Sequence, residues 1–188
     1  GSGHLSQNFT LARARQHFAR NELEKALEST KAVLREVPDH AAALELAGAA
    51  YFKQHNFAKA AKVLAELVEI YPDVGPMSRT RLAISYLHLE KYGRAAGLLD
   101  RLVAENENNG SLHLLAACAH ARLKNRDKAI ANFAEAGELL GIGLLAHVSN
   151  PDLNPLRSDE RFLRIIQAVN AGIQSAESGP AAAEPNES

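Results

Sequence analysis

The stretch AAALELAGAAYFKQHNFAKAAKVLAELVEIYPDVG, residues 41–75, decides the fold. Its apolar residues recur every three or four positions in two runs separated by a polar break, which predicts two helices. The first run is Leu44, Ala47, Gly48 and Tyr51, and the second is Ala60, Leu64 and Leu67. Pro72 ends the second run because proline cannot continue a helix. Small residues lie where the helices would touch, so the stretch predicts a closely packed helical hairpin.

The same pattern recurs along the chain. Windows that begin at Gln7, Ala41, Pro76 and Gly110 are spaced by 34, 35 and 34 residues, and each contains two helical runs. One hairpin cannot bury its apolar face alone, so neighbouring hairpins must stack and the last must be capped. We therefore expect four repeated units, at residues 7–40, 41–75, 76–109 and 110–141.

These residues resemble the tetratricopeptide repeat, a helix-turn-helix motif with a small residue at its eighth position, an aromatic at its eleventh, alanine at its twentieth and proline at its thirty-second. The eighth positions here are Ala14, Gly48, Ala83 and Ala117, and the twentieth are Ala26, Ala60, Ala95 and Ala129. The departures are His17 and His120 for the aromatic, Glu107 and Gly141 for proline, and one inserted residue between 72 and 76. The resemblance implies an all-α fold, a right-handed α-solenoid of four such units.

The flanking segments differ from the repeats. The chain begins Gly-Ser-Gly without methionine, so we expect residues 1–6 to be a flexible expression remnant. Residues 142–172 are expected to form a degenerate fifth unit that caps the solenoid, with Ser158 at the N-cap of its last helix. Residues 173–188 are rich in Pro, Gly, Ser and Glu without apolar periodicity, which predicts a disordered tail.

Composition excludes several classes of function. The chain is 46% hydrophobic and 23% charged, and 21 basic against 22 acidic residues leave no basic excess for nucleic acid. A single cysteine excludes an intrachain disulfide. No apolar stretch approaches the 18 residues of a membrane span, so we expect no direct membrane insertion. The compartment stays open: cytoplasmic is favoured, or periplasmic if a signal or anchor was removed.

No constellation of residues predicts catalysis, a metal or a cofactor. Only His113 and His120 share a helical face at ligand spacing, and both occupy packing positions of the fourth repeat. Cys118 lies among alanines, which favours a packed thiol over a reactive one. Gly141-Ile142-Gly143 lacks the strand and lysine of a phosphate-binding loop. We therefore expect a protein that is not an enzyme.

In the resembled family, the first helices of successive repeats line a concave groove. Carried onto this sequence, that implies a mostly apolar, mildly basic partner-binding groove made of Leu11, Arg15, Phe18, Glu45, Ala49, Phe52, Lys53, Met77, Arg81, Ile84, Leu87, His88, Leu114, Cys118 and Arg122. An exposed apolar surface of that length indicates a binding site. The expected partner is a protein or peptide, an amphipathic helix or extended segment with apolar anchors and some acidic residues.

These observations predict a non-catalytic interaction module or scaffold. Three alternatives stay open. In the first, the protein is a secretion or assembly chaperone that holds a disordered client. In the second, it is the docking domain of a larger enzyme or membrane complex. In the third, the groove is filled by the chain's own N-terminal stretch or its last helix, residues 159–169.

Overall fold

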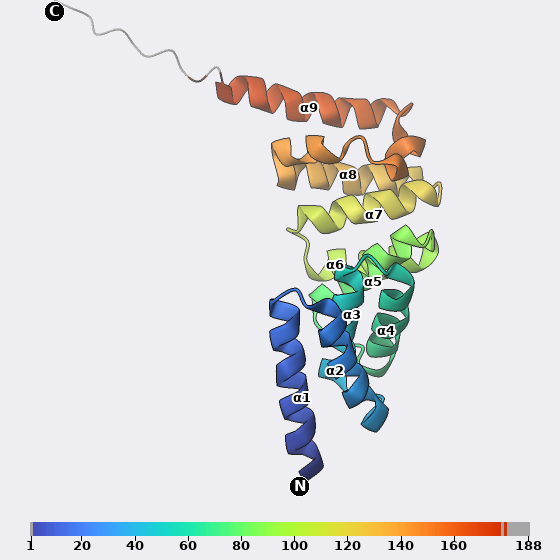
Figure 1. Cartoon of the computed structure of the whole chain (residues 1–188). Helices are drawn as coiled ribbons and strands as arrows, with labels where there is room; N and C mark the ends of the chain where they lie inside the picture. Colours follow the sequence, from blue (N-terminus) through green and yellow to red (C-terminus); the bar gives the residue numbers. More distant parts are fainter. Residues whose placement is uncertain (1, 178, 180–188) are drawn as a thin grey trace, which may run out of the picture. The chain divides into compact units, whose positions relative to one another are not determined.

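The computed structural model describes residues 2–177 and 179, and those residues form helices and turns without a β-strand (Figure 1). The chain divides into two compact units, Gly1–Leu102 and Val103–Ser188. Each unit is built from helices joined by short turns, as the apolar periodicity predicts.

The first unit contains the first three helical pairs. Its helices are α1 (Ser2–Ala19), α2 (Leu23–Glu36), α3 (Ala41–Lys53), α4 (Phe57–Ile70), α5 (Pro76–His88) and the greater part of α6 (Tyr92–Glu105). Helix α1 packs on α2 and α3 on α4, while α2 packs on α3 and α4 on α5. The first helices also touch, α1 with α3 and α3 with α5. These contacts place α1, α3 and α5 side by side along one face of the unit.

Small residues allow the helices of each pair to approach. Ala14, Ala83 and Ala117, at the eighth repeat position, have no exposed surface. Gly48 occupies that position in the second repeat, where a Cβ atom would lie 2.3 Å from Leu64 Cδ2. The alanines at the twentieth position are likewise fully buried. The predicted seams of small residues are therefore present.

The turn inside each hairpin repeats as strictly as the helices do. A residue with left-handed backbone conformation follows each first helix: Asn21, His55, Glu90 and Lys124, with φ between 57° and 63°. The next residue donates its N–H to a carbonyl in the preceding helical turn, as in Asn56 N to Tyr51 O at 2.9 Å. This bond satisfies a carbonyl that the end of the helix leaves unpaired.

The second unit contains the fourth helical pair and the helices that follow it. Its helices are α7 (Gly110–Arg122), α8 (Arg126–Leu140), the short 3-10 helices η1 (Gly141–His147) and η2 (Pro151–Leu156), and α9 (Glu160–Glu177). Helix α7 packs on α8, α9 packs on α8 and η1, and η2 packs on α7. Phe133 of α8 stacks on Phe162 of α9 with ring centroids 4.6 Å apart, and both rings are buried.

Several boundaries differ from the sequence prediction. Residues 2–6 belong to α1, in which Thr10 Oγ1 donates to Ser6 O at 2.9 Å. Helix α9 continues through residues 173–177, and of the predicted disordered tail only Gly179 is otherwise described. Asp159, and not Ser158, caps α9, because its Oδ1 accepts the Arg161 N–H at 2.9 Å.

The expectation about long apolar stretches is also wrong at one place. The segment Arg126–His147 is long and apolar enough to cross a membrane by length and composition alone, since an 18-residue window within its 22 residues has a mean hydropathy of 1.4. It forms α8 and η1, which pack against α7 and α9. Of the window with this hydropathy, 33% is buried inside the protein.

Candidate interaction surfaces

The first unit keeps most of the predicted groove residues at its surface. They come from α1, α3 and α5, and we name them the first-helix surface: Arg15, Phe18, Glu45, Phe52, Lys53, Met77, Arg81, Ile84 and His88. Met77 is 64% exposed, which is unusual for a large apolar side chain. Phe18, Phe52 and Ile84 are half-buried. The surface therefore combines apolar side chains with several cations.

Aromatic contacts order part of this surface. The Phe57 ring, at the start of α4, stacks on His88 with centroids 3.9 Å apart and meets the edge of Phe52 at 5.8 Å. The Lys53 ammonium lies 5.2 Å from the centre of the Phe18 ring, within the range of a cation–π contact. Sequence reasoning missed Phe57, because it belongs to a second helix and the groove pattern counts only first helices.

Charge on the first-helix surface is partly balanced. Ser78 Oγ donates to Glu45 Oε1 at 3.3 Å. Burial lowers the pKa of Arg81, and the negative charge of Glu45 acts in the opposite direction. Arg15 and Lys53 are exposed to solvent. With Arg81 offset by Glu45, these two residues give the surface its positive character.

Three predicted groove residues of the first unit are buried and do not form a surface. Leu11 is 4% exposed and packs with Val33 and Ala43 in the core between the first two pairs. Ala49 is 6% exposed and Leu87 is 9% exposed. Because these three side chains are already packed, we leave them out of the first-helix surface.

In the fourth repeat, two of the three predicted groove residues, Leu114 and Cys118, are covered by the chain itself. Leu114 and Cys118 of α7 share a core cluster with Leu153 and Leu156 of η2. Asn150 Nδ2 donates to Cys118 Sγ at 3.7 Å, and exposed Arg122 Nε lies 3.7 Å from Asp152 Oδ1. The groove is thus filled internally here, as one alternative anticipated, but by residues 150–156 instead of the last helix.

The chemistry of Cys118 follows from this cover. Burial raises the pKa of its thiol from the ordinary 9.0 to about 12, and the charge of Asp152 adds to the effect. A thiol in this state is protonated and unreactive near neutral pH.

Both histidines considered as ligands are packed. His113 contacts Asn132 Oδ1 through Nδ1 at 3.1 Å and Glu107 O through Nε2 at 2.8 Å. His120 is 3% exposed. Among residues 2–177 and 179, no three His, Cys, Asp or Glu side chains gather in a way that would hold a metal ion.

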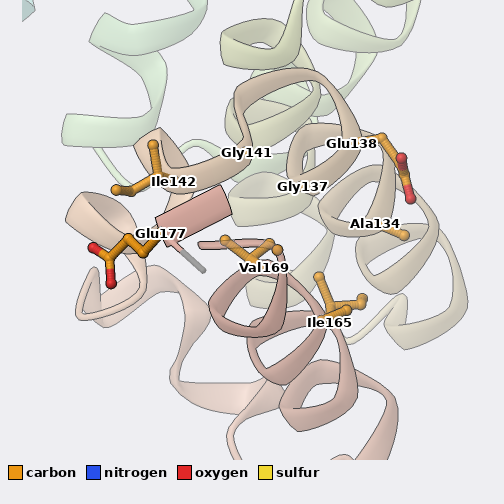
Figure 2. A pocket seen from close by; sticks show the side chains of 10 residues that line it. Ala134, Gly137, Glu138, Gly141, Ile142, Ile165, Val169 and Glu177 are labelled. Atoms are coloured by element: carbon orange, nitrogen blue, oxygen red, sulfur yellow. The ribbon is translucent and has the colours of Figure 1, made fainter. Parts of the chain in front are cut away.

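A second surface feature lies outside the repeats. A cleft of about 540 Å³ opens between the C-terminal half of α8, the start of η1 and α9, and Figure 2 shows the side chains around it. Ile142, Ile165 and Val169 supply apolar wall, and Glu138 and Glu177 stand at its edges (Figure 2). Sequence reasoning missed this cleft, because only folding brings α9 against α8.

Comparison with known families settles the nature of the repeats. A sequence profile described as tetratricopeptide repeat matches residues 11–74 and 80–138. The chain belongs to the tetratricopeptide repeat family. Comparison with curated protein sequences finds no significant match.

Solved structures of tetratricopeptide repeat proteins share the fold. A crystal structure of MamA protein has a TM-score of 0.78 at 14% identity, over 95% of this chain and 98% of that one. MamA from residue 41 to its end, from Desulfovibrio magneticus RS-1, has a TM-score of 0.76 at 16% identity, over 93% and 97%. MamA of AMB-1 has 20% identity and a TM-score of 0.69, over 95% and 96%. These likenesses confirm the all-α helical repeat solenoid.

Proposed function

We propose that this protein is a non-catalytic scaffold that binds a partner segment on its first-helix surface. Tetratricopeptide repeats are interaction modules, which supports the general role. The finer assignment depends on which first-helix side chains stay accessible, and in the first unit these are Phe18, Phe52, Met77 and Ile84 with the cations around them. Large apolar side chains beside exposed cations favour a partner with apolar anchors and acidic residues.

The single observation that carries the proposal is the way residues 150–156 cover the fourth repeat. This segment places Leu153 and Leu156 against α7 and sets Asp152 beside Arg122. It is therefore an internal example of an apolar and acidic segment bound to a first helix. Lys53 occupies in the second repeat the position that Arg122 occupies in the fourth, and it is exposed.

The partner that best suits the first-helix surface thus resembles this internal segment. It would bring two apolar side chains a few residues apart and one carboxylate near them. The carboxylate would pair with Lys53, and the apolar side chains would cover Met77 and Ile84. A buried contact at an anchor of this kind typically contributes about 2 kcal/mol or more.

The test is capture of partners from the native cell by the immobilised chain, followed by mass spectrometry. The double variant Lys53→Glu with Met77→Ser removes one cation and one exposed anchor. The matched control is a second double variant, Lys62→Glu with Ile70→Ser on α4. It changes an exposed lysine and a 46% exposed isoleucine that lie away from the first helices.

The expected result is a protein that the parent chain and the control variant capture and the double variant loses. Circular dichroism should show the same helical content in all three chains. If the double variant and the control variant retain every partner equally, binding on the first-helix surface is refuted. If both variants lose the partner, the surface that binds it is not limited to the first helices.

A further inference from the structure

The cleft between α8, η1 and α9 is shaped by small residues on facing helices. Gly137 of α8 allows a close approach, since a Cβ there would meet Ile165 Cγ2 at 3.2 Å and Val169 Cγ2 at 3.7 Å. A Cβ on Gly172 would meet nothing within 4 Å, so the cleft is open above this part of α9. Ile142 at the rim is 64% exposed. The cleft therefore presents apolar surface that no described segment covers.

Charge around the cleft is one-sided. From residue 129 to residue 146 the only charged side chains are Glu135 and Glu138, and from 165 to 177 the only one is Glu177. The cations at the other end of α9 already have acidic partners. Arg161 pairs with Asp127 and Asp159, and Arg164 pairs with Glu160. The walls of the cleft thus carry carboxylates without a neutralising cation.

The helix ends add to this negative potential. Glu138 lies in the last turn of α8 and Glu177 is the last residue of α9, and neither helix has a basic residue in its last turn. A helix C-terminus carries partial negative charge, so a carboxylate there is unfavourable and a cation is stabilising. A positively charged ligand would relieve both glutamates at once.

We infer that this cleft is a second docking site, separate from the first-helix surface, for a basic amphipathic segment of another protein. Its apolar side chains, spaced three or four residues apart, enter between α8 and α9 against Ile142, Ile165 and Val169. Its lysines or arginines flank these anchors and pair with Glu138 and Glu177. The volume of about 540 Å³ falls within the usual range of apolar ligand sites.

Charge argues against the chain's own C-terminal residues as the occupant. The sequence after Glu177 reads SGPAAAEPNES, with two glutamates, no lysine or arginine and no large apolar residue. Like charges would repel this segment from the two glutamates of the cleft, and alanines would fill little of it. A separate basic partner has the opposite charge and larger apolar side chains.

The experiment uses the full chain and a designed peptide of about 14 residues, near four helical turns, built from leucine and lysine in helical period. Its twin carries glutamate in place of every lysine, and a third peptide has the same composition without the period. Binding is followed by the NMR shifts of the Gly137, Gly141 and Gly172 amides, which lie in the cleft wall. The variants are Glu138→Lys and Glu177→Lys, and the control is Glu135→Lys, an exposed position on α8 outside the cleft.

We expect the chemical shifts of the three glycine amides to change saturably with the lysine peptide and not with the other two peptides. Each cleft variant should weaken binding by about fivefold and the control by less than about twofold, because exposed ion pairs contribute modestly. The inference is overturned if the glutamate twin or the aperiodic peptide binds equally, or if the shifts fall mainly on other residues. The inference is also overturned if removal of residues 178–188 changes the chemical shifts of the same amides in the free protein, since those residues would then occupy the cleft.

Discussion

The cover that η2 places over the fourth repeat can be tested through the one cysteine of the chain. Cys118 is 2% exposed, and its cluster includes Leu153 and Leu156, which have no exposed surface. Leu153→Ala removes apolar contact from η2 and leaves a cavity, a change that costs about 2–5 kcal/mol at fully buried sites. Because Leu153 belongs to a short 3-10 helix, we expect this loss to act first on the local opening of η2.

The magnitude follows from the opening equilibrium. A loss of about 3 kcal/mol raises the open population about a hundredfold, since about 1.4 kcal/mol corresponds to a factor of ten. A thiol reagent reacts with the open form, so labelling of Cys118 should accelerate by about the same factor. In the open form the thiol returns toward its ordinary pKa of 9.0 from about 12. The labelling rate should therefore level off above about pH 9 and not continue to rise toward pH 12.

The assay is the rate of reaction with a chromogenic disulfide reagent in excess, measured from pH 7 to 10. Leu64→Ala is the matched control, because Leu64 is also fully buried but belongs to α4 in the other unit. A labelling rate of Leu153→Ala within about twofold of the parent would refute the cover. Equal acceleration by both substitutions would show that labelling requires global unfolding, and the local opening of η2 would then be wrong.

Three smaller predictions concern stability. Gly48→Ala should lower the free energy of unfolding in urea by about 1–2 kcal/mol, because the clash with buried Leu64 exceeds the gain in helix propensity of about 1 kcal/mol. Asn109→Ala should cost about 1 kcal/mol in the same titration, since its side chain accepts the Leu112 N–H at 3.2 Å and caps α7. Arg161 lowers the pKa of Asp159, so this pair stabilises the fold above the ordinary pKa of 3.8, and the contribution disappears as the pH falls below it. An NMR titration of Arg161→Ala should show the Asp159 pKa move upward.

The repeats were predictable because their signal is local and occurs four times. Each hairpin needs small residues where its helices cross, and Ala14, Ala83 and Ala117 mark those crossings at fixed spacing. The turns carried no such signal. Left-handed residues are usually glycine or asparagine, whereas His55 and Glu90 hold that conformation here because the surrounding hairpin fixes it.

The packing of the segment that follows the fourth repeat could not be predicted from the sequence. Two prolines and a following amphipathic run indicated a closing unit, but nothing local showed that Leu153 and Leu156 would pack on α7. That contact joins residues more than thirty positions apart and occurs once, so no repetition reveals it. The cleft beside α9 could not be predicted for the same reason, because it also forms from a single contact between distant segments. A family pattern of groove positions therefore predicts which way a side chain faces. It does not predict whether another segment of the chain covers that side chain.

The contrast between the two units restricts how such a scaffold would work. In the fourth repeat, η2 covers the first helix, where Leu153 and Leu156 share a core cluster with Leu114 and Cys118. Accessible apolar surface then remains on α1, α3 and α5 in one unit and beside α9 in the other. Arg15 and Lys53 favour an acidic segment on the first, and Glu138 and Glu177 favour a basic segment on the second. If both proposals hold, the two surfaces select segments of opposite charge, so each would reject the other's partner by repulsion.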